Sequence, residues 1–347
     1  MVPFLSICTL LSTVYLWWGI RCLPAERWQM AAAVPVARDP DGGWRGVNIT
    51  WYGILSANAY GAAALLFLAL AATLGAPLTL TLATLGATLV ICVPASRLVA
   101  RLVEGKRHTF TVGGAVFVGT IAAPFVVSLM NRLLAPADGR LPAMALLAAT
   151  ACAYALGEGF GRLACVSFGC CYGKPMAEAH PLIGRLLAGR AFVFQGETKK
   201  VSYAGEKAGV PLVPIQGITA ILYTATALAG SALFLSGRFA LSFLVAMGVT
   251  QLWRTVSEFV RDDYRGDNCI SAYQIMGILA VIYGAATAFY FRGEAPLLPD
   301  AGRIAASLWS PAVILPLQFI WLAILFYTGR STVTGSRIHF HVHRERI

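Results

Sequence analysis

Charged residues lie in this sequence beside apolar segments that are long enough to cross a membrane. The stretch 157–173, GEGFGRLACVSFGCCYG, contains five glycines, Glu158, Arg162 and three cysteines. An ionisable group at such a position costs free energy unless it is paired, so its presence indicates a functional site. The alternative is a glycine-rich helix end whose arginine extends to the lipid headgroups.

A second charged group closes another apolar segment, in LWRTVSEFVRDDYRGDN. Arg254, Glu258 and Arg261 are spaced four and three residues apart, which places them on one face of a helix. A guanidinium group matches phosphate oxygens with two parallel hydrogen bonds, so this group predicts a phosphate clamp. The alternative is an internal Arg–Glu pair that ties helices together. Glu158 and Arg162 repeat the four-residue spacing.

Other polar residues are weaker candidates. Gln216 and Gln274 open apolar segments, where a single glutamine usually makes an interhelical hydrogen bond. The loop RLVEGKRHTFTVGG contains His108, for which a solvated loop histidine is the alternative, and Gly113 with Gly114, which permit close approach of a ligand or a helix.

The cysteines could suggest a metal site, but their spacing argues against one. Cys165, Cys170 and Cys171 lack the paired C-x2-C spacing of zinc and iron–sulfur sites, and adjacent cysteines seldom bind one ion. We therefore expect no metal and a tightly packed membrane turn. GEGFG lacks the preceding strand of a dinucleotide-binding turn, so no cofactor is expected either.

The elements that must position these residues are membrane helices. The chain is 58% hydrophobic and 12% charged, with a mean hydropathy of +0.69, which is not typical of a soluble domain. The apolar segments are close to the roughly 20 residues that cross a bilayer. The sequence therefore predicts an all-α polytopic membrane protein with about nine transmembrane helices. The predicted spans are 2–20, 51–74, 78–99, 111–134, 141–161, 212–235, 239–260, 270–291 and 311–328.

Three of the segments outside these spans carry further predictions. Residues 23–48 are polar and rich in proline and glycine, which predicts a loop or linker. Residues 174–211 form the longest polar segment, and its part AEAHPLIGRLLAGRAFVF mixes apolar and basic side chains, which predicts an amphipathic stretch lying flat on the headgroups. The tail RIHFHVHRERI favours a basic anchor over a metal-binding tail. The net charge of +11 is not accompanied by any nucleic-acid-binding motif, so nucleic acid is not an expected partner.

Several blocks together resemble the prolipoprotein diacylglyceryl transferase family, in particular its cysteine-rich branch. GRLACVSFGCCYGKP resembles the family signature, and five further blocks follow the family order. The resemblance covers residues 50–291 and seven helices, which predicts a membrane core there. It makes 1–49 an additional helix with a polar linker, and 292–347 an additional helix with a basic tail. The further blocks are WYG at Trp51–Gly53, VGG at Val112–Gly114, P-x-Q at Pro214–Gln216, R-x3-E-x2-R at Arg254–Arg261 and S-x2-Q at Ser271–Gln274.

Members of this family transfer a diacylglyceryl group from phosphatidylglycerol to the thiol of a lipobox cysteine and release glycerol 1-phosphate. The resemblance implies a bacterial inner-membrane enzyme whose partners are phosphatidylglycerol, or another anionic phospholipid, and a prolipoprotein signal peptide. It implies catalytic, phosphate-binding roles for Arg162 and Arg254. The implied substrate-binding residues are Glu158, Gly161, Gly113, Gly114, Gln216, Glu258, Arg261 and Gln274.

The chain departs from the family pattern at four positions. Val112 occupies the place of the usual histidine before Gly-Gly, so His108 is the candidate catalytic base in its stead. The other departures are Thr219 for a glutamate, Thr250 for a tyrosine and Cys165 for an asparagine. They leave open a paralogue that uses another acceptor, and a lipid-binding protein without catalysis.

Basic residues are distributed unevenly about the predicted spans. Of the 27 lysines and arginines, 22 fall in loops on the side that carries Arg162 and Arg254, and 5 fall on the opposite side. The positive-inside rule therefore predicts that this side faces the cytoplasm. The family resemblance instead implies the outer face.

Overall fold

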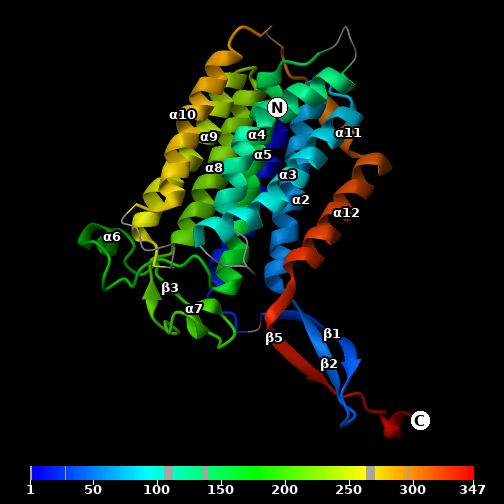
Figure 1. Cartoon of the computed structure of the whole chain (residues 1–347), viewed down its shortest axis with the longest axis vertical. Coiled ribbons are helices and arrows are strands. Elements are labelled where there is room, and N and C mark those ends of the chain that lie inside the picture. The colour runs from blue at the N-terminus through cyan, green and yellow to red at the C-terminus, as the bar shows by residue number, and fades with distance from the viewer. Residues whose placement is uncertain (1, 28, 105–111, 136–139, 263–269, 295–296) are drawn as a thin grey trace.

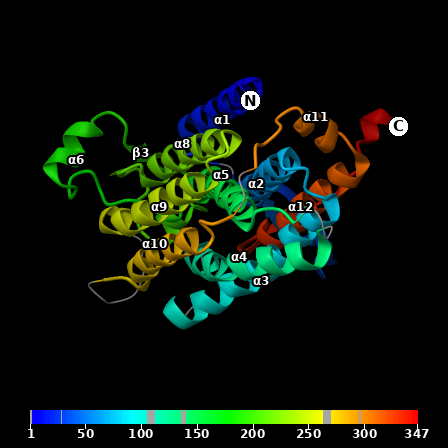
Figure 2. The same cartoon turned by 90° about the horizontal axis from the view of Figure 1, so that it is seen from above.

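The protein is described by a computed structural model that covers residues 2–27, 29–104, 112–135, 140–262, 270–294 and 297–347. In these ranges, nine helices are long and apolar enough to cross a membrane, which confirms the predicted all-α polytopic class. They run side by side along the long axis (Figure 1), and Figure 2 shows the bundle from above. They are α1 (Val2–Cys22), α2 (Trp51–Thr73), α3 (Leu78–Glu104), α4 (Val112–Leu134), α5 (Ala143–Phe168), α8 (Ile215–Leu235), α9 (Phe239–Ser257), α10 (Ala272–Tyr290) and α12 (Pro311–Thr328).

Helix α5 is the central helix, and 72% of an apolar 18-residue stretch of it is buried. It packs mainly against α2, α8 and α9. The predicted end at residue 161 is wrong, because α5 continues to Phe168. Its glycines allow close packing of the helices. A methyl group at Gly157 would lie 2.8 Å from Cβ of Ala63, and one at Gly159 would lie 2.6 Å from Oγ1 of Thr224.

A small sheet contradicts the predicted linker at 23–48. β1 (Met30–Arg38) and β2 (Trp44–Thr50) form an antiparallel hairpin, and β5 (Arg330–Ile338) pairs with β2 on its other side. The hairpin turns at Gly42, whose φ of +87° suits glycine. The linker prediction failed because β2 pairs with β5, which lies about 280 residues further along the chain. The local composition of residues 23–48 cannot indicate such a distant partner. The sheet pairs the segment that follows α1 with the segment that follows α12, and it lies below the bundle (Figure 1).

The segment 174–211 folds against the same end of the bundle (Figure 1). Leu182 and Leu186 are exposed on its first helix, whereas Lys199 is fully buried and donates a hydrogen bond to the Leu23 carbonyl at 2.7 Å. Burial lowers the pKa of Lys199 to about 8. This segment contains α6 (Pro181–Leu186), β3 (Phe192–Val193), α7 (Lys200–Tyr203) and β4 (Pro211–Leu212); η1 (Glu258–Val260), α11 (Arg303–Leu308) and η2 (Arg344–Arg346) complete the elements.

Candidate active site

Glu158, in α5, holds two arginines with one carboxylate. Nη2 of Arg254, from α9, donates to both carboxylate oxygens at 2.8 Å. Arg162, one turn further along α5, pairs with Oε1, as its four-residue spacing predicts. The side chains of Glu158, Arg162 and Arg254 are only 3%, 11% and 8% exposed. A buried carboxylate therefore fixes two guanidinium groups side by side.

The predicted common helical face of Arg254, Glu258 and Arg261 does not extend to Arg261, although Glu258 and Arg261 pair. Helix α9 ends at Ser257, and the chain continues through the single 3-10 turn η1 before Arg261 becomes extended. Because this turn is tighter than an α-helix, the spacing rule for α-helices no longer applies beyond Ser257. Glu258 pairs with Arg261 at 3.6 Å and accepts a hydrogen bond from Ser271 at 3.3 Å. Arg254 is instead tied to α5 through Glu158.

The central group has charge and hydrogen-bonding capacity for an anion. Two guanidinium groups and one carboxylate leave one net positive charge. In the described part of the chain, Nε of Arg162 and Nε of Arg254 are buried without a hydrogen-bond partner. Leaving such a donor unsatisfied costs about 1–3 kcal/mol, more when it is charged. A phosphodiester carries one negative charge and several acceptor oxygens, which complements the single net positive charge of this group.

A cavity of about 270 Å³ opens beside Arg162. Residues of α2, α3, α4, α5 and α12 enclose it, with two apolar residues from α9. Its α5 wall includes Glu158, Gly161, Arg162 and Cys165, and Val112 of α4 also lines the cavity. Most of the remaining wall is apolar. The cavity therefore combines an anion-binding wall with a lining suited to hydrocarbon.

Tyr154 is a site residue that sequence reasoning missed. It lines the cavity, and its hydroxyl accepts a hydrogen bond from Gln251 at 3.0 Å and a longer one from Arg254 at 3.5 Å. The signal was present in the sequence, since Tyr154, Glu158 and Arg162 recur every four residues. They form one polar stripe along an otherwise apolar helix.

The two glycines that open α4 serve different contacts. A methyl group at Gly113 would lie 2.9 Å from Nη1 of Arg254 and 2.7 Å from Cδ1 of Tyr273. Gly113 therefore lets α4 approach the arginine. Gly114 meets the Val99 side chain of α3, so its contact is helix packing.

The two predicted glutamines hold backbone segments. Gln216, at the start of α8, donates to the Cys170 carbonyl at 3.0 Å. Gln274 forms a capping box with Ser271 at the start of α10 and donates to the Thr255 carbonyl at 3.3 Å. Both behave as the tertiary hydrogen-bond partners that a membrane glutamine usually provides.

Two of the four departures from the family pattern, Val112 and Cys165, line the cavity. Thr219 accepts a hydrogen bond from the Trp253 indole at 2.9 Å, and the hydroxyl of Thr250 donates to the Ala246 carbonyl at 2.7 Å. His108, the predicted base, lies outside the described residues.

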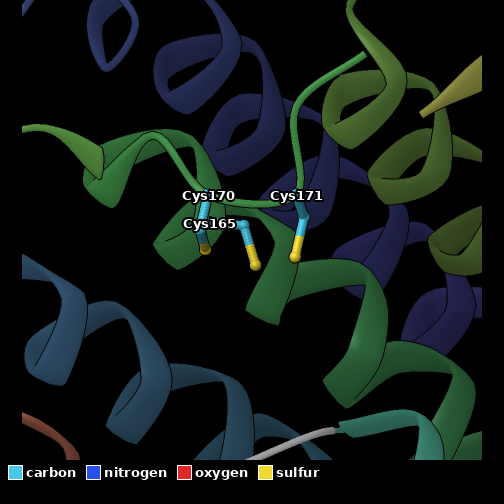
Figure 3. A group of neighbouring side chains, drawn as sticks. All are labelled: Cys165, Cys170 and Cys171. Carbon is cyan, nitrogen blue, oxygen red and sulfur yellow. The ribbon is translucent and has the colours of Figure 1, made fainter. Parts of the chain in front are cut away.

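The fold brings together the side chains of Cys165, Cys170 and Cys171, whose spacing in the sequence argued against a shared site. The sulfur atoms of Cys165, Cys170 and Cys171 lie within 4.8 Å of one another and point to the same side (Figure 3). Helix α5 ends at Phe168. The φ of +68° at Gly169 then turns the chain back, and the Cys170 amide donates to the Cys165 carbonyl at 3.1 Å. The spacing of the cysteines along the chain therefore does not argue against a shared site, because the fold brings their sulfur atoms together.

Residues 44–290 match the sequence profile of the family described as prolipoprotein diacylglyceryl transferase, which is more than half of the chain. The chain belongs to this family. A search of curated proteins found no match. The family is one of multi-pass membrane transferases of lipoprotein biosynthesis, located in bacteria in the inner membrane. The match confirms the resemblance that the ordered sequence blocks indicated.

Proposed function

We propose that this protein transfers the diacylglyceryl group of phosphatidylglycerol to a cysteine thiol, that of a prolipoprotein lipobox, and releases glycerol 1-phosphate. The observation that supports this most directly is the buried pair of arginines that Glu158 holds beside the apolar cavity. The group matches the single charge of a phosphodiester, and the cavity matches its lipid substituents.

The proposed chemistry places negative charge on phosphate. When the carbon–oxygen bond of the glyceryl group breaks, its electron pair stays on the leaving phosphate oxygen. Guanidinium groups already fixed in a site that excludes water stabilise that charge without reorganising. Arg162, in the cavity wall, would bind the phosphate directly, and Arg254 would share its charge through Glu158.

A different acceptor at the inner leaflet is the second candidate. The end of the bundle that carries the arginines also carries 22 of the 27 basic residues, which predicts a cytoplasmic site. Val112 replaces the usual histidine at the cavity. Lipid and lipoprotein mass spectrometry of a deletion strain would separate the two acceptors, because each leaves a different product unmodified.

The test is transfer by the purified protein in nanodiscs. Phosphatidylglycerol labelled in its headgroup and a synthetic lipobox peptide are supplied, and release of labelled glycerol phosphate is measured. We expect Arg162→Ala and Arg254→Ala to lower the rate at least about 100-fold, the scale for removing one preorganised charge-stabilising group. Arg162→Lys, which keeps the charge and loses the planar fork, should fall between these variants and the unmodified protein.

Arg190→Ala is the matched control. Arg190 is exposed in the segment after α6. The described hydrogen bond of its side chain goes to the nearby Leu186 carbonyl, so its loss should leave the rate unchanged. A well-folded protein that binds phosphatidylglycerol and never releases glycerol phosphate would refute the proposed transfer. Complementation of a strain depleted of its own diacylglyceryl transferase extends the same test to cells.

A further inference from the structure

We propose that Cys165, Cys170 and Cys171 form a three-thiolate zinc site whose open fourth position binds and activates the acceptor thiol. This inference deepens the proposed function and rests on it. It assigns a role to a cluster that the phosphate chemistry leaves unused, and it addresses the departure at Val112.

The backbone and a hydrogen bond from a neighbouring helix hold the three cysteines of this cluster together. The turn at Gly169 brings Cys170 back over the last turn of α5, and Gln216 of α8 fixes that turn by donating to the Cys170 carbonyl. Cys171 follows with a φ of +56°, in the left-handed region that side chains other than glycine rarely adopt. Such a conformation costs about 1–3 kcal/mol and persists where surrounding structure imposes it. Here it directs the third sulfur toward the other two (Figure 3).

The sulfur geometry is close to that of a zinc site. The three sulfur atoms lie within 4.8 Å of one another, and zinc–sulfur bonds of about 2.3 Å would require separations of roughly 3.8 Å. Small side-chain rotations would close any remaining difference. In the part of the chain that the structure describes, no further histidine, cysteine or carboxylate joins the group. Three protein ligands and an open position are typical of catalytic zinc.

The open fourth position of the proposed zinc site lies next to the cavity that would take the phosphate ester. Cys165 lines the same cavity as Arg162, which precedes it by three residues and therefore lies on the same face of α5. An acceptor sulfur bound beside Cys165 would reach the cavity that takes the phosphate ester.

The proposed step balances without a histidine. The acceptor thiol loses its proton to water as its sulfur binds zinc, since a coordinating thiol is deprotonated. The bound thiolate attacks the glyceryl carbon that bears the phosphate ester. A carbon–sulfur bond forms, the carbon–oxygen bond breaks, and its electron pair leaves on glycerol 1-phosphate as a dianion. The neutral thioether is a weak ligand and departs from the metal.

The first test measures metal alone. Reduced protein is titrated with Zn²⁺, and with Co²⁺ as a coloured substitute, and bound metal is counted by mass spectrometry. We expect one ion per chain and a thiolate-to-cobalt charge-transfer band, both lost in Cys165→Ser, Cys170→Ser and Cys171→Ser. Cys152→Ser is the matched control, because Cys152 is buried in α5 and bonds Ser242 away from the cluster. Absence of binding by the unmodified protein would overturn the inference, whatever the variants do.

The second test measures the open position without requiring transfer. A lipobox peptide added to the cobalt protein should intensify the charge-transfer band, and the same peptide with serine in place of cysteine should not. A band that ignores the thiol would refute the activating role. If metal and thiol bind but no glycerol phosphate is released, the proposed transfer fails and the thiol site stands. If metal-free protein transfers at the full rate, the zinc inference fails and the proposed transfer stands.

Discussion

At the residue scale, Glu158 determines how the two arginines of the site are held together. Without it, Arg162 and Arg254 would bring two like charges together in a buried setting. With it, they form a group of one net positive charge that still has buried donors to offer. Breaking a buried ion pair by removing one partner leaves an uncompensated charge, which is far more costly than replacing the whole pair.

We therefore predict that Glu158→Gln lowers the free energy of unfolding by about 3–5 kcal/mol, the scale for an uncompensated buried charge. Thermal unfolding in detergent measures the change. Glu178→Gln, at an exposed position in the segment after α5, is the matched control and should change little. Equal stability of the two variants would contradict the buried hub.

At the element scale, the start of α4 must lie close to α9 and α10. Gly113 makes this approach possible, because any side chain there meets the Arg254 guanidinium and the Tyr273 ring. Gly248 of α9 offers a contrast, since a methyl group added there meets nothing within 4 Å.

Gly113→Ala should accordingly cost about 1–3 kcal/mol, the scale for overpacking a core, and should lower phosphatidylglycerol affinity by displacing Arg254. Gly248→Ala should be neutral or stabilising by up to about 1 kcal/mol, because alanine is the better helix former. Thermal unfolding and lipid binding measured on both variants test this. Wild-type behaviour of Gly113→Ala would show that α4 need not approach the arginine so closely.

At the scale of the whole molecule, one end of the bundle collects the polar structure. The sheet of β1, β2 and β5, the segment 174–211 and the C-terminus all lie at this end (Figure 1). The nine described spans agree with those that divide the basic residues 22 to 5, so the charge asymmetry is not explained by a misassigned helix. The division into 1–49, 50–291 and 292–347 stays a prediction.

We predict that this end faces the cytoplasm, as the positive-inside rule requires. A fluorescent protein fused after Ile347 should fluoresce, and alkaline phosphatase at the same position should be inactive. Fusions after Gly237, in the connection between α8 and α9, should give the reverse result. An active phosphatase after Ile347 would place the site at the outer leaflet and remove the support for an inner-leaflet acceptor.

The sequence by itself determined the nine spans, the family and the pairing of Glu158 with Arg162. These depend on hydropathy, on ordered motifs and on a four-residue spacing, all of which are local along the chain. For the same reason the stripe that includes Tyr154 could have been found from the sequence.

Only the tertiary structure decided which partners meet across the fold. It joined Arg254 to Glu158, paired β2 with a strand about 280 residues away, and gathered three thiols whose spacing argued against a shared site. Each of these contacts depends on where a helix ends or how two distant segments pack. The 3-10 turn after Ser257 and the left-handed residues Gly169 and Cys171 set those directions, and residue spacing does not encode them.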